Sequence, residues 1–317
     1  QTRNLLFAQK YGEADSVLTL AEALTPRLDE DHRNLAAVNF SLRADLASAR
    51  DGDAAVADSL SRMAYDFARA IDPDGGEAAT YLNNAAQYHS QSGDYEGALA
   101  DFDLALELYE RRFGTDHPEY ATCLENRGGV LYQLGRTDET FEALNQVRDI
   151  RARNLGKAHI DVVRTGLNMG AVASRAGNYE EALAIFEELK PILIEARGPD
   201  HVDNLVVLRN QGIALRSLKR KEESMEVFKE ALALSLRMFG EDHPQTARAK
   251  SDYGVALGIL KRYSEAEEYL LFALEGYLKE VGPDHPKTRE LKETLVILYD
   301  RMGEPEKGEQ YRESDGG

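Results

Sequence analysis

Five short segments recur along this 317-residue chain, each 42 residues after the one before. Each begins with glycine and has histidine three positions later, and they start at Gly114, Gly156, Gly198, Gly240 and Gly282. The glycine can take a positive φ and end one helix, and the Asp-His-Pro form of the segment suits the start of the next. Because a fixed period of about 20 to 50 residues is typical of stacked repeats, the sequence predicts a repeat array rather than ordinary globular domains.

A second turn recurs within each 42-residue unit, at Gly93, Gly135, Gly177, Lys219 and Lys261. Apolar residues follow this turn at helical spacing and predict one buried stripe on each second helix: Ala98, Phe102 and Ala105; Ala182, Phe186 and Leu189; Ala266, Leu270 and Ala273. The first helices carry a small residue at one fixed place, namely Ala44, Ala86, Gly128, Gly170, Gly212 and Gly254. Since glycine costs about 1 kcal/mol of helix propensity there, we expect a neighbouring helix to approach closely.

The period divides the chain into helix pairs, predicted at about 33–71, 76–113, 118–155, 160–197, 202–239, 244–281 and 286–314. We expect one repeat domain over residues 1–317, with a partial repeat at 1–32, six repeats over 33–285, and a capping repeat and tail at 286–317. The chain begins at Gln1 rather than methionine. It is therefore expected to be part of a longer protein.

Composition limits the partners. The formal net charge of −18 repels phosphate backbones, so nucleic acid is not an expected partner. No apolar run is long enough to cross a bilayer, so we expect no membrane contact by this segment. A single cysteine, Cys123, excludes a disulfide framework and favours a reducing, cytoplasmic compartment.

The residues from Leu82 to Leu99, LNNAAQYHSQSGDYEGAL, resemble the tetratricopeptide repeat family, and in particular its 42-residue class found in kinesin light chains. The resemblance extends over nearly the whole chain. It implies an all-α, right-handed superhelical solenoid of helix-turn-helix repeats whose first helices line a concave groove. No unit carries tryptophan, and the doubled asparagine of the kinesin light chain pattern occurs only at Asn83-Asn84, so the resemblance is taken to imply architecture and a peptide groove.

An asparagine recurs once per first helix, as Asn84, Asn126, Asn168 and Asn210, and the series continues as Asp252. In family members an asparagine here contacts the backbone of a bound peptide, because an amide offers both a donor and an acceptor. The alternative is that these amides bridge adjacent helices. Four net hydrogen bonds at about 1 kcal/mol each would give a Kd near 1 mM, so other groups must add affinity.

Basic side chains gather on the first helices of the central units, whereas the second helices are rich in glutamate. The basic residues are Arg164, Arg175, Arg209, Arg216, Arg248 and Lys250. We expect the first five, with the four asparagines, to form a peptide-binding site for an acidic or C-terminal peptide through guanidinium-carboxylate contacts. The alternative is that several of these arginines only solvate the helix faces.

Metal binding and catalysis are not predicted. His117, His159, His201, His243 and His285 fall in successive turns, whereas ligands must converge on one ion, so a capping or turn-packing role is favoured. The sequence holds no phosphate-binding loop, nucleophile elbow, paired metal-binding histidines or kinase signature. We therefore predict a protein that is not an enzyme and has no cofactor.

Three functions fit the sequence. The first is a protein-protein interaction scaffold that binds a peptide or partner protein in the groove. The second is a regulatory or sensor domain of a larger signalling protein, such as a bacterial Ser/Thr kinase or transcription regulator. The third is an assembly module that self-associates through the ends of the repeat array.

Overall fold

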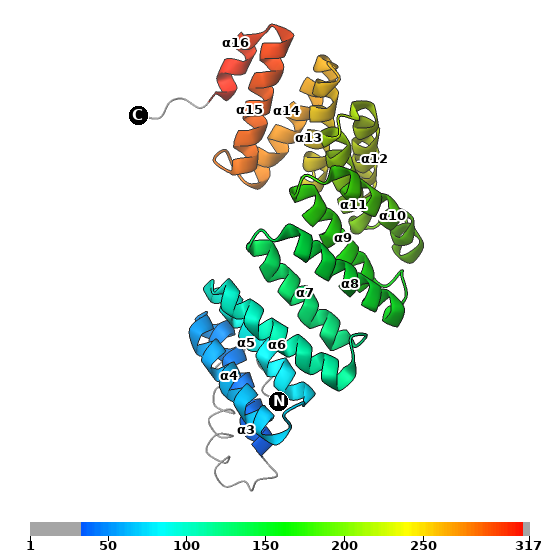
Figure 1. Cartoon of the computed structure of the whole chain (residues 1–317). Helices are drawn as coiled ribbons and strands as arrows, with labels where there is room; N and C mark the ends of the chain where they lie inside the picture. The colour runs from blue at the N-terminus through cyan, green and yellow to red at the C-terminus, as the bar shows by residue number, and fades with distance from the viewer. Residues whose placement is uncertain (1–32, 313–317) are drawn as a thin grey trace. The chain divides into compact units, whose positions relative to one another are not determined.

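The computed structural model describes residues 33–312, which form fourteen α-helices, each packed on its neighbours in sequence within one of two compact units (Figure 1). This confirms the predicted all-α class and the helix-turn-helix repeat. The partial repeat expected at residues 1–32 and the end of the tail at 313–317 lie outside the described residues. The chain divides into two compact units, Gln1–Gly156 and Lys157–Gly317.

The helix boundaries follow the 42-residue period closely. Within the first unit the α-helices are α3 (Arg33–Leu46), α4 (Ala54–Ile71), α5 (Gly76–Ser92), α6 (Tyr95–Phe113), α7 (Pro118–Gln133) and α8 (Thr137–Leu155), and a π-helical turn, Ala47–Asp51, follows α3. Within the second unit they are α9 (Ile160–Arg175), α10 (Tyr179–Arg197), α11 (Val202–Ser217), α12 (Lys221–Phe239), α13 (Pro244–Ile259), α14 (Tyr263–Glu280), α15 (Pro286–Met302) and α16 (Pro305–Gly308), and a short 3₁₀ turn, Glu309–Tyr311, follows α16. From α5 to α14 the odd-numbered helices are the first helices of the repeats, and the even-numbered helices are the second.

The turn between the two helices of a repeat requires a left-handed residue. Gly93, Gly135 and Gly177 have φ of 88°, 73° and 83°. The two later repeats place Lys219 and Lys261 in the same conformation, each with φ of 62°. Lysine pays a steric cost there that glycine does not, because its Cβ crowds the backbone.

Replacing Lys219 or Lys261 with glycine is therefore expected to raise the free energy of unfolding by about 1 kcal/mol at each site. Urea unfolding followed by helical circular dichroism measures the change. Gly177→Lys, the reverse exchange at the same place in the preceding repeat, serves as the matched control and should lower stability. Loss of stability in the Lys219→Gly variant would contradict the steric argument.

The core of each repeat is the stripe predicted on its second helix. Ala182, Phe186 and Leu189 are buried, as are the corresponding residues of α6 and α14. The small residues of the first helices lie against these stripes: a Cβ added at Gly170 would come within 2.4 Å of the Phe186 ring, and one at Gly212 within 2.6 Å of Phe228. The predicted close approach is confirmed, and the approaching element is the second helix of the same repeat.

The five periodic histidines cap the first helices. In each, Nδ1 accepts a hydrogen bond from the backbone N–H two residues later, at 3.1 to 3.2 Å. Two of the rings also stack on the aromatic residue that ends the preceding helix, His117 on Phe113 and His243 on Phe239. The predicted capping and turn-packing role is therefore confirmed for these residues.

The described helices also bear on the expectations drawn from composition. None of them is long and apolar enough to cross a membrane. Cys123 is only 1% exposed, and burial raises the pKa of its thiol above the ordinary value. Cys123 is thus a core residue of α7.

Candidate functional site

The asparagine series occupies different environments in the two units. In the second unit Asn168 is exposed on α9 and Asn210 is half-buried on α11. Asp252 takes the corresponding place on α13 and accepts a hydrogen bond from Arg209 Nε at 2.8 Å. The amides of Asn168 and Asn210 thus lie at or near the surface, where a bound chain could reach them.

The first unit uses its asparagines partly to join helices. Asn126 Nδ2 on α7 donates to Asn83 Oδ1 on α5 at 3.2 Å, and Asn83 Nδ2 lies 3.5 Å from Asn84 Oδ1. Asn84 and Asn126 are both half-buried. This geometry favours the bridging role for Asn126, while the peptide-binding role of the series stays a prediction.

Three of the five predicted arginines come together in the second unit. Arg209 and Arg216 of α11 and Arg248 of α13 line one pocket of about 300 Å³ on the surface of α11, α13 and α15. We call it the basic pocket: its charged lining consists of four basic and two acidic side chains, namely Arg209, Arg216, Arg248, Lys287, Asp252 and Glu290. Its net charge of +2 contrasts with the −18 of the whole chain.

The five arginines predicted for the peptide-binding site differ in their ion-pair partners. Arg209 pairs with Asp252, and Arg164 forms an ion pair at 3.2 Å with Asp161 on its own helix. Within residues 33–312, Arg216 and Arg248 form neither a hydrogen bond nor an ion pair with the protein. Of the three arginines that line the basic pocket, only Arg209 is thus paired with an acidic side chain of the described residues. Arg164 and Arg175 do not line the basic pocket.

Lys250 does not belong to this surface. Its side chain is buried, its Nζ forms an ion pair with Glu241, and it lies over the Phe272 ring. Sequence reasoning grouped Lys250 with the arginines because it lies on the same helix as Arg248. The helix instead turns it into the core, at the place where the two preceding repeats have Leu208 and Gly166.

Tyr277 of α14 lines the basic pocket from the second-helix layer. Burial and the nearby Asp252 carboxylate raise its pKa to about 12, although Arg248 acts in the opposite direction. The phenol therefore stays protonated at neutral pH and can donate a hydrogen bond.

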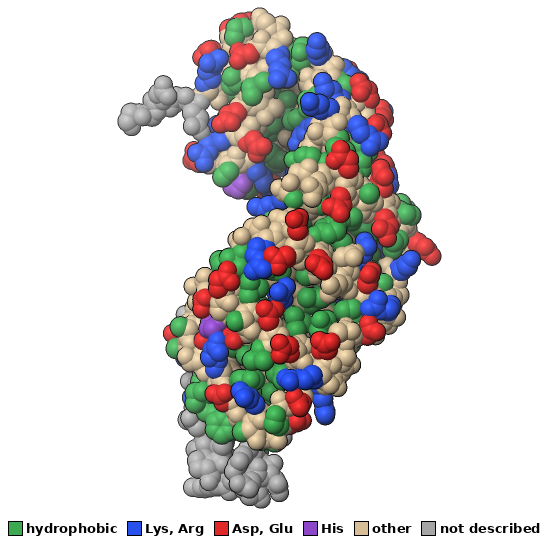
Figure 2. Space-filling model, viewed as in Figure 1, with side chains coloured by type: hydrophobic (Ala, Val, Ile, Leu, Met, Phe, Trp, Pro, Cys, Tyr) green, Lys and Arg blue, Asp and Glu red, His purple; other side chains and the backbone are tan. Residues whose placement is uncertain are grey.

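On the face shown in Figure 2, acidic and basic side chains are interspersed. The excess of basic side chains in the basic pocket is therefore a local feature.

Sequence reasoning missed an apolar series beside the asparagines. Ala171, Ile213, Val255 and Ile297 are 42 residues apart, and each lies three residues after a member of the series Asn168, Asn210, Asp252 and Thr294. Residues three apart on a helix share a face. Applying the period to that offset would have found these residues, and two of them, Ile213 and Val255, line the basic pocket.

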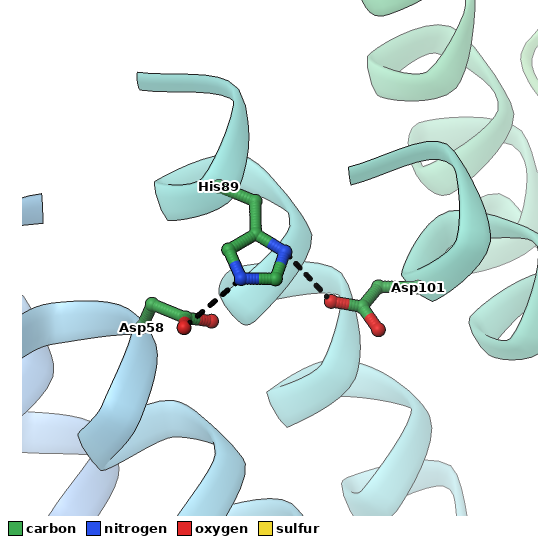
Figure 3. A group of neighbouring side chains, drawn as sticks. All are labelled: Asp58, His89 and Asp101. Carbon is green, nitrogen blue, oxygen red and sulfur yellow. Dashed lines mark ion pairs between the residues drawn. The ribbon is translucent and has the colours of Figure 1, made fainter. Parts of the chain in front are cut away.

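A charged cluster in the first unit was also missed. His89 of α5 lies between Asp58 of α4 and Asp101 of α6, with its Nε2 3.0 Å from an Asp58 oxygen and its Nδ1 3.2 Å from an Asp101 oxygen (Figure 3). Burial raises the pKa of Asp101 above its ordinary value, although Arg62 and His89 act to lower it. No repeat signal reveals the cluster, because its members do not follow the period.

Arg62 supplies the positive charge of this cluster. The ligand atoms of the three residues lie within 4.8 Å of one another, and imidazole and carboxylate are ligand types for zinc. Arg62 bonds to both carboxylates, however, with Nε 3.2 Å from Asp58 and Nη2 2.5 Å from Asp101. The guanidinium thus occupies the position that a cation would take, and the cluster ties α4, α5 and α6 together.

The first unit has a larger pocket, of about 430 Å³, which contains none of the predicted site residues. It lies where α4 turns into α5, beside Phe113 of α6. Its charged residues are Asp72, Glu77, Arg112 and Glu119, three acids and one base. It therefore offers an acidic ligand no local attraction, and the basic pocket is the stronger candidate site.

The sequence matches a protein-family model, and the fold matches solved structures. The tetratricopeptide repeat family model matches residues 77–153, 161–237 and 245–311, which is more than half of the chain. No curated protein sequence matches significantly. The sequence thus carries the repeat signature over most of its length.

Several solved structures share the fold at low sequence identity. The apo form of RapI is similar over 98% of this chain and 84% of its own, with a TM-score of 0.68 and 15% identity. BtubC (BKLC) from P. vanneervenii is similar over 74% of this chain and 92% of its own, with a TM-score of 0.61 and 18% identity. A putative kinesin light chain of Podosopora anserina with nearly identical TPR-like repeats is similar over 65% of this chain and 98% of its own, with a TM-score of 0.57 and 17% identity. At these identities the likeness establishes the fold alone.

Proposed function

Because this chain belongs to the tetratricopeptide repeat family, whose members are typically protein-binding scaffolds, we propose that it is a non-catalytic scaffold that binds an acidic peptide segment of a partner protein. The basic pocket is the binding site. The observation that carries the proposal is the convergence of Arg209, Arg216 and Arg248 on one pocket. Two of these arginines, Arg216 and Arg248, form no hydrogen bond or ion pair with the described residues.

The chemistry of the pocket suits a carboxylate. A guanidinium presents a planar fork of donors that matches the two oxygens of an acidic side chain or chain terminus. Arg209 is held by Asp252, which leaves Arg216 and Arg248 to engage the ligand. The exposed amide of Asn168 and the half-buried amide of Asn210, on α9 and α11, would bond the peptide backbone.

Magnitudes show why the arginines matter more than the asparagines. A hydrogen bond to a charged group contributes about 1.5 to 3 kcal/mol, against about 1 kcal/mol for a neutral one. Two guanidinium contacts therefore contribute about 3 kcal/mol or more, a factor of at least about 100 in affinity. Asn168 and Asn210 can each donate and accept one backbone hydrogen bond, about 4 kcal/mol in all, so the guanidinium contacts bring the Kd from near 1 mM towards 10 μM, as an order of magnitude.

The test is selection of nine-residue peptides from a fully randomised phage library, followed by anisotropy measurements on the enriched sequences. We expect Asp and Glu to be enriched. Reversing both free charges, Arg216→Glu with Arg248→Glu, should weaken binding of an enriched peptide by about 100-fold or more.

The control reverses two exposed charges on second helices, Lys229→Glu with Lys279→Glu. This variant has the same net charge as the pocket variant, so it corrects for general repulsion of acidic peptides. It should bind within about threefold of the native chain. Enrichment of peptides without acids, no enrichment at all, or equal losses in the two variants would each refute the proposal.

A further inference from the structure

An apolar pocket adjoins the basic pocket on the same helices. It has a volume of about 210 Å³ and lies between α13 and α15, over Leu270 of α14. Its main apolar walls are Val255, Ile259, Ile297 and Leu298. The two pockets share Val255 and Thr294, so they form one continuous surface.

Glycine keeps this second pocket open. Gly258 lies 42 residues after Arg216, so the helix position that carries a cation in the basic pocket carries no side chain here. A Cβ at Gly258 would lie 3.6 Å from Leu298 and 3.8 Å from Ala266, which is ordinary contact distance. A longer side chain at Gly258 would therefore extend into the pocket without disturbing the backbone.

The pocket exposes hydrophobic surface that the fold leaves uncovered. Ile297 is 52% exposed, more than any other large hydrophobic residue found exposed within residues 33–312. An aliphatic or aromatic side chain placed against Ile297 and Val255 would remove this surface from water. A cavity of about 150 Å³ is known to be large enough for benzene, so the pocket has room for such a side chain.

The spacing of the pockets fixes the spacing of the groups that they would bind. On α13 the basic pocket is lined from residues 248–255 and the apolar pocket from residues 254–259, so the midpoints of the two stretches lie about five residues, or about 7 to 8 Å, apart at about 1.5 Å rise per residue. An extended peptide advances about 3.3 Å per residue. Two groups about 7 to 8 Å apart therefore lie two or three residues apart in such a peptide.

We propose that the site recognises a two-part motif, an acidic residue with a large aliphatic or aromatic residue two or three positions away. The acidic residue binds Arg216 and Arg248, and the apolar residue fills the pocket at Ile297. Arg301, at the rim of the apolar pocket, adds positive charge beside it and suits a peptide that is acidic on both sides of the apolar residue. This inference rests on the proposed binding of acidic peptides and adds to it the identity of a second residue.

The randomised nine-residue library described above tests the motif directly. We expect Leu, Ile, Val, Met or Phe to be enriched two or three positions from the selected acidic residue. Replacing that apolar residue with serine should weaken binding to the native chain about tenfold, the scale expected for burying part of an aliphatic side chain. In the Ile297→Asn and Gly258→Leu variants, the enriched peptide and its serine-substituted form should bind equally.

The matched control is Leu278→Asn, which changes an exposed leucine of α14 outside both pockets. It should retain the tenfold preference. Selection of acidic peptides without an apolar preference, or a preference that survives in the Ile297→Asn and Gly258→Leu variants, would overturn the two-part motif and leave the proposed function standing. Selection without acidic residues would instead overturn the proposed function and the motif together.

Discussion

Gly170→Ala is expected to lower the free energy of unfolding by about 2 to 3 kcal/mol, although alanine is the better helix former. The added Cβ would lie 2.4 Å from Cζ of Phe186. Phe186 is fully buried, so its ring has no free space to move into. The helices α9 and α10 must then separate or the ring must leave its preferred rotamer. Urea unfolding followed by helical circular dichroism measures the loss.

Gly128→Ala is the matched control, because Gly128 holds the same place one repeat earlier. A Cβ there would lie 3.5 Å from Ala143 Cβ, at ordinary contact distance. This substitution should therefore raise stability by about 0.5 to 1 kcal/mol through helix propensity. The same substitution is thus expected to act in opposite directions in two repeats. Equal effects at the two positions would show that packing against Phe186 does not decide the outcome.

Glu125→Ala is expected to cost about 3 kcal/mol, because it removes the carboxylate that pairs with a buried guanidinium. Arg151 Nη1 and Nη2 donate to the two oxygens of Glu125 at 3.0 and 2.6 Å, and the Arg151 side chain is only 10% exposed. The exposed pair Arg136–Glu139 has the same two-bond geometry and serves as control. Glu139→Ala should cost far less than Glu125→Ala, because solvent screens an exposed ion pair.

The double variant Glu125→Leu with Arg151→Leu separates the stability that the ion pair contributes from the cost of removing only its carboxylate. The next repeat already has Leu167 and Leu193 at these two places. We therefore expect the double variant to unfold within about 1 kcal/mol of the native chain. A loss as large as that of Glu125→Ala would mean that the ion pair itself stabilises the first unit. Thermal and urea unfolding of the native chain and the three variants provide the comparison.

The candidate site was only partly predictable. The period located Arg209, Arg216 and Arg248 on first helices, and the structure brings all three to one pocket. The pairing of Arg209 with Asp252 and the burial of Lys250 could not be read from the sequence. Both depend on the rotation of each helix about its axis, which neighbouring helices set through packing. The apolar pocket depends on Gly258 and Ile297 meeting across α13 and α15, and neither residue is notable alone.

The sequence by itself determined the local structure of this protein. The 42-residue period, the left-handed turn residues, the histidine caps and the second-helix stripes are short-range features, fixed by backbone sterics, hydrogen bonding and helical periodicity. Only the tertiary structure decided which charges are neutralised: Arg62 lies between Asp58 and Asp101 and Arg151 pairs with Glu125, whereas Arg216 and Arg248 line the basic pocket. The pairings of Arg62 with Asp101 and of Arg151 with Glu125 join residues 39 and 26 positions apart, on different helices. They follow from packing geometry, which a pattern along the chain does not contain.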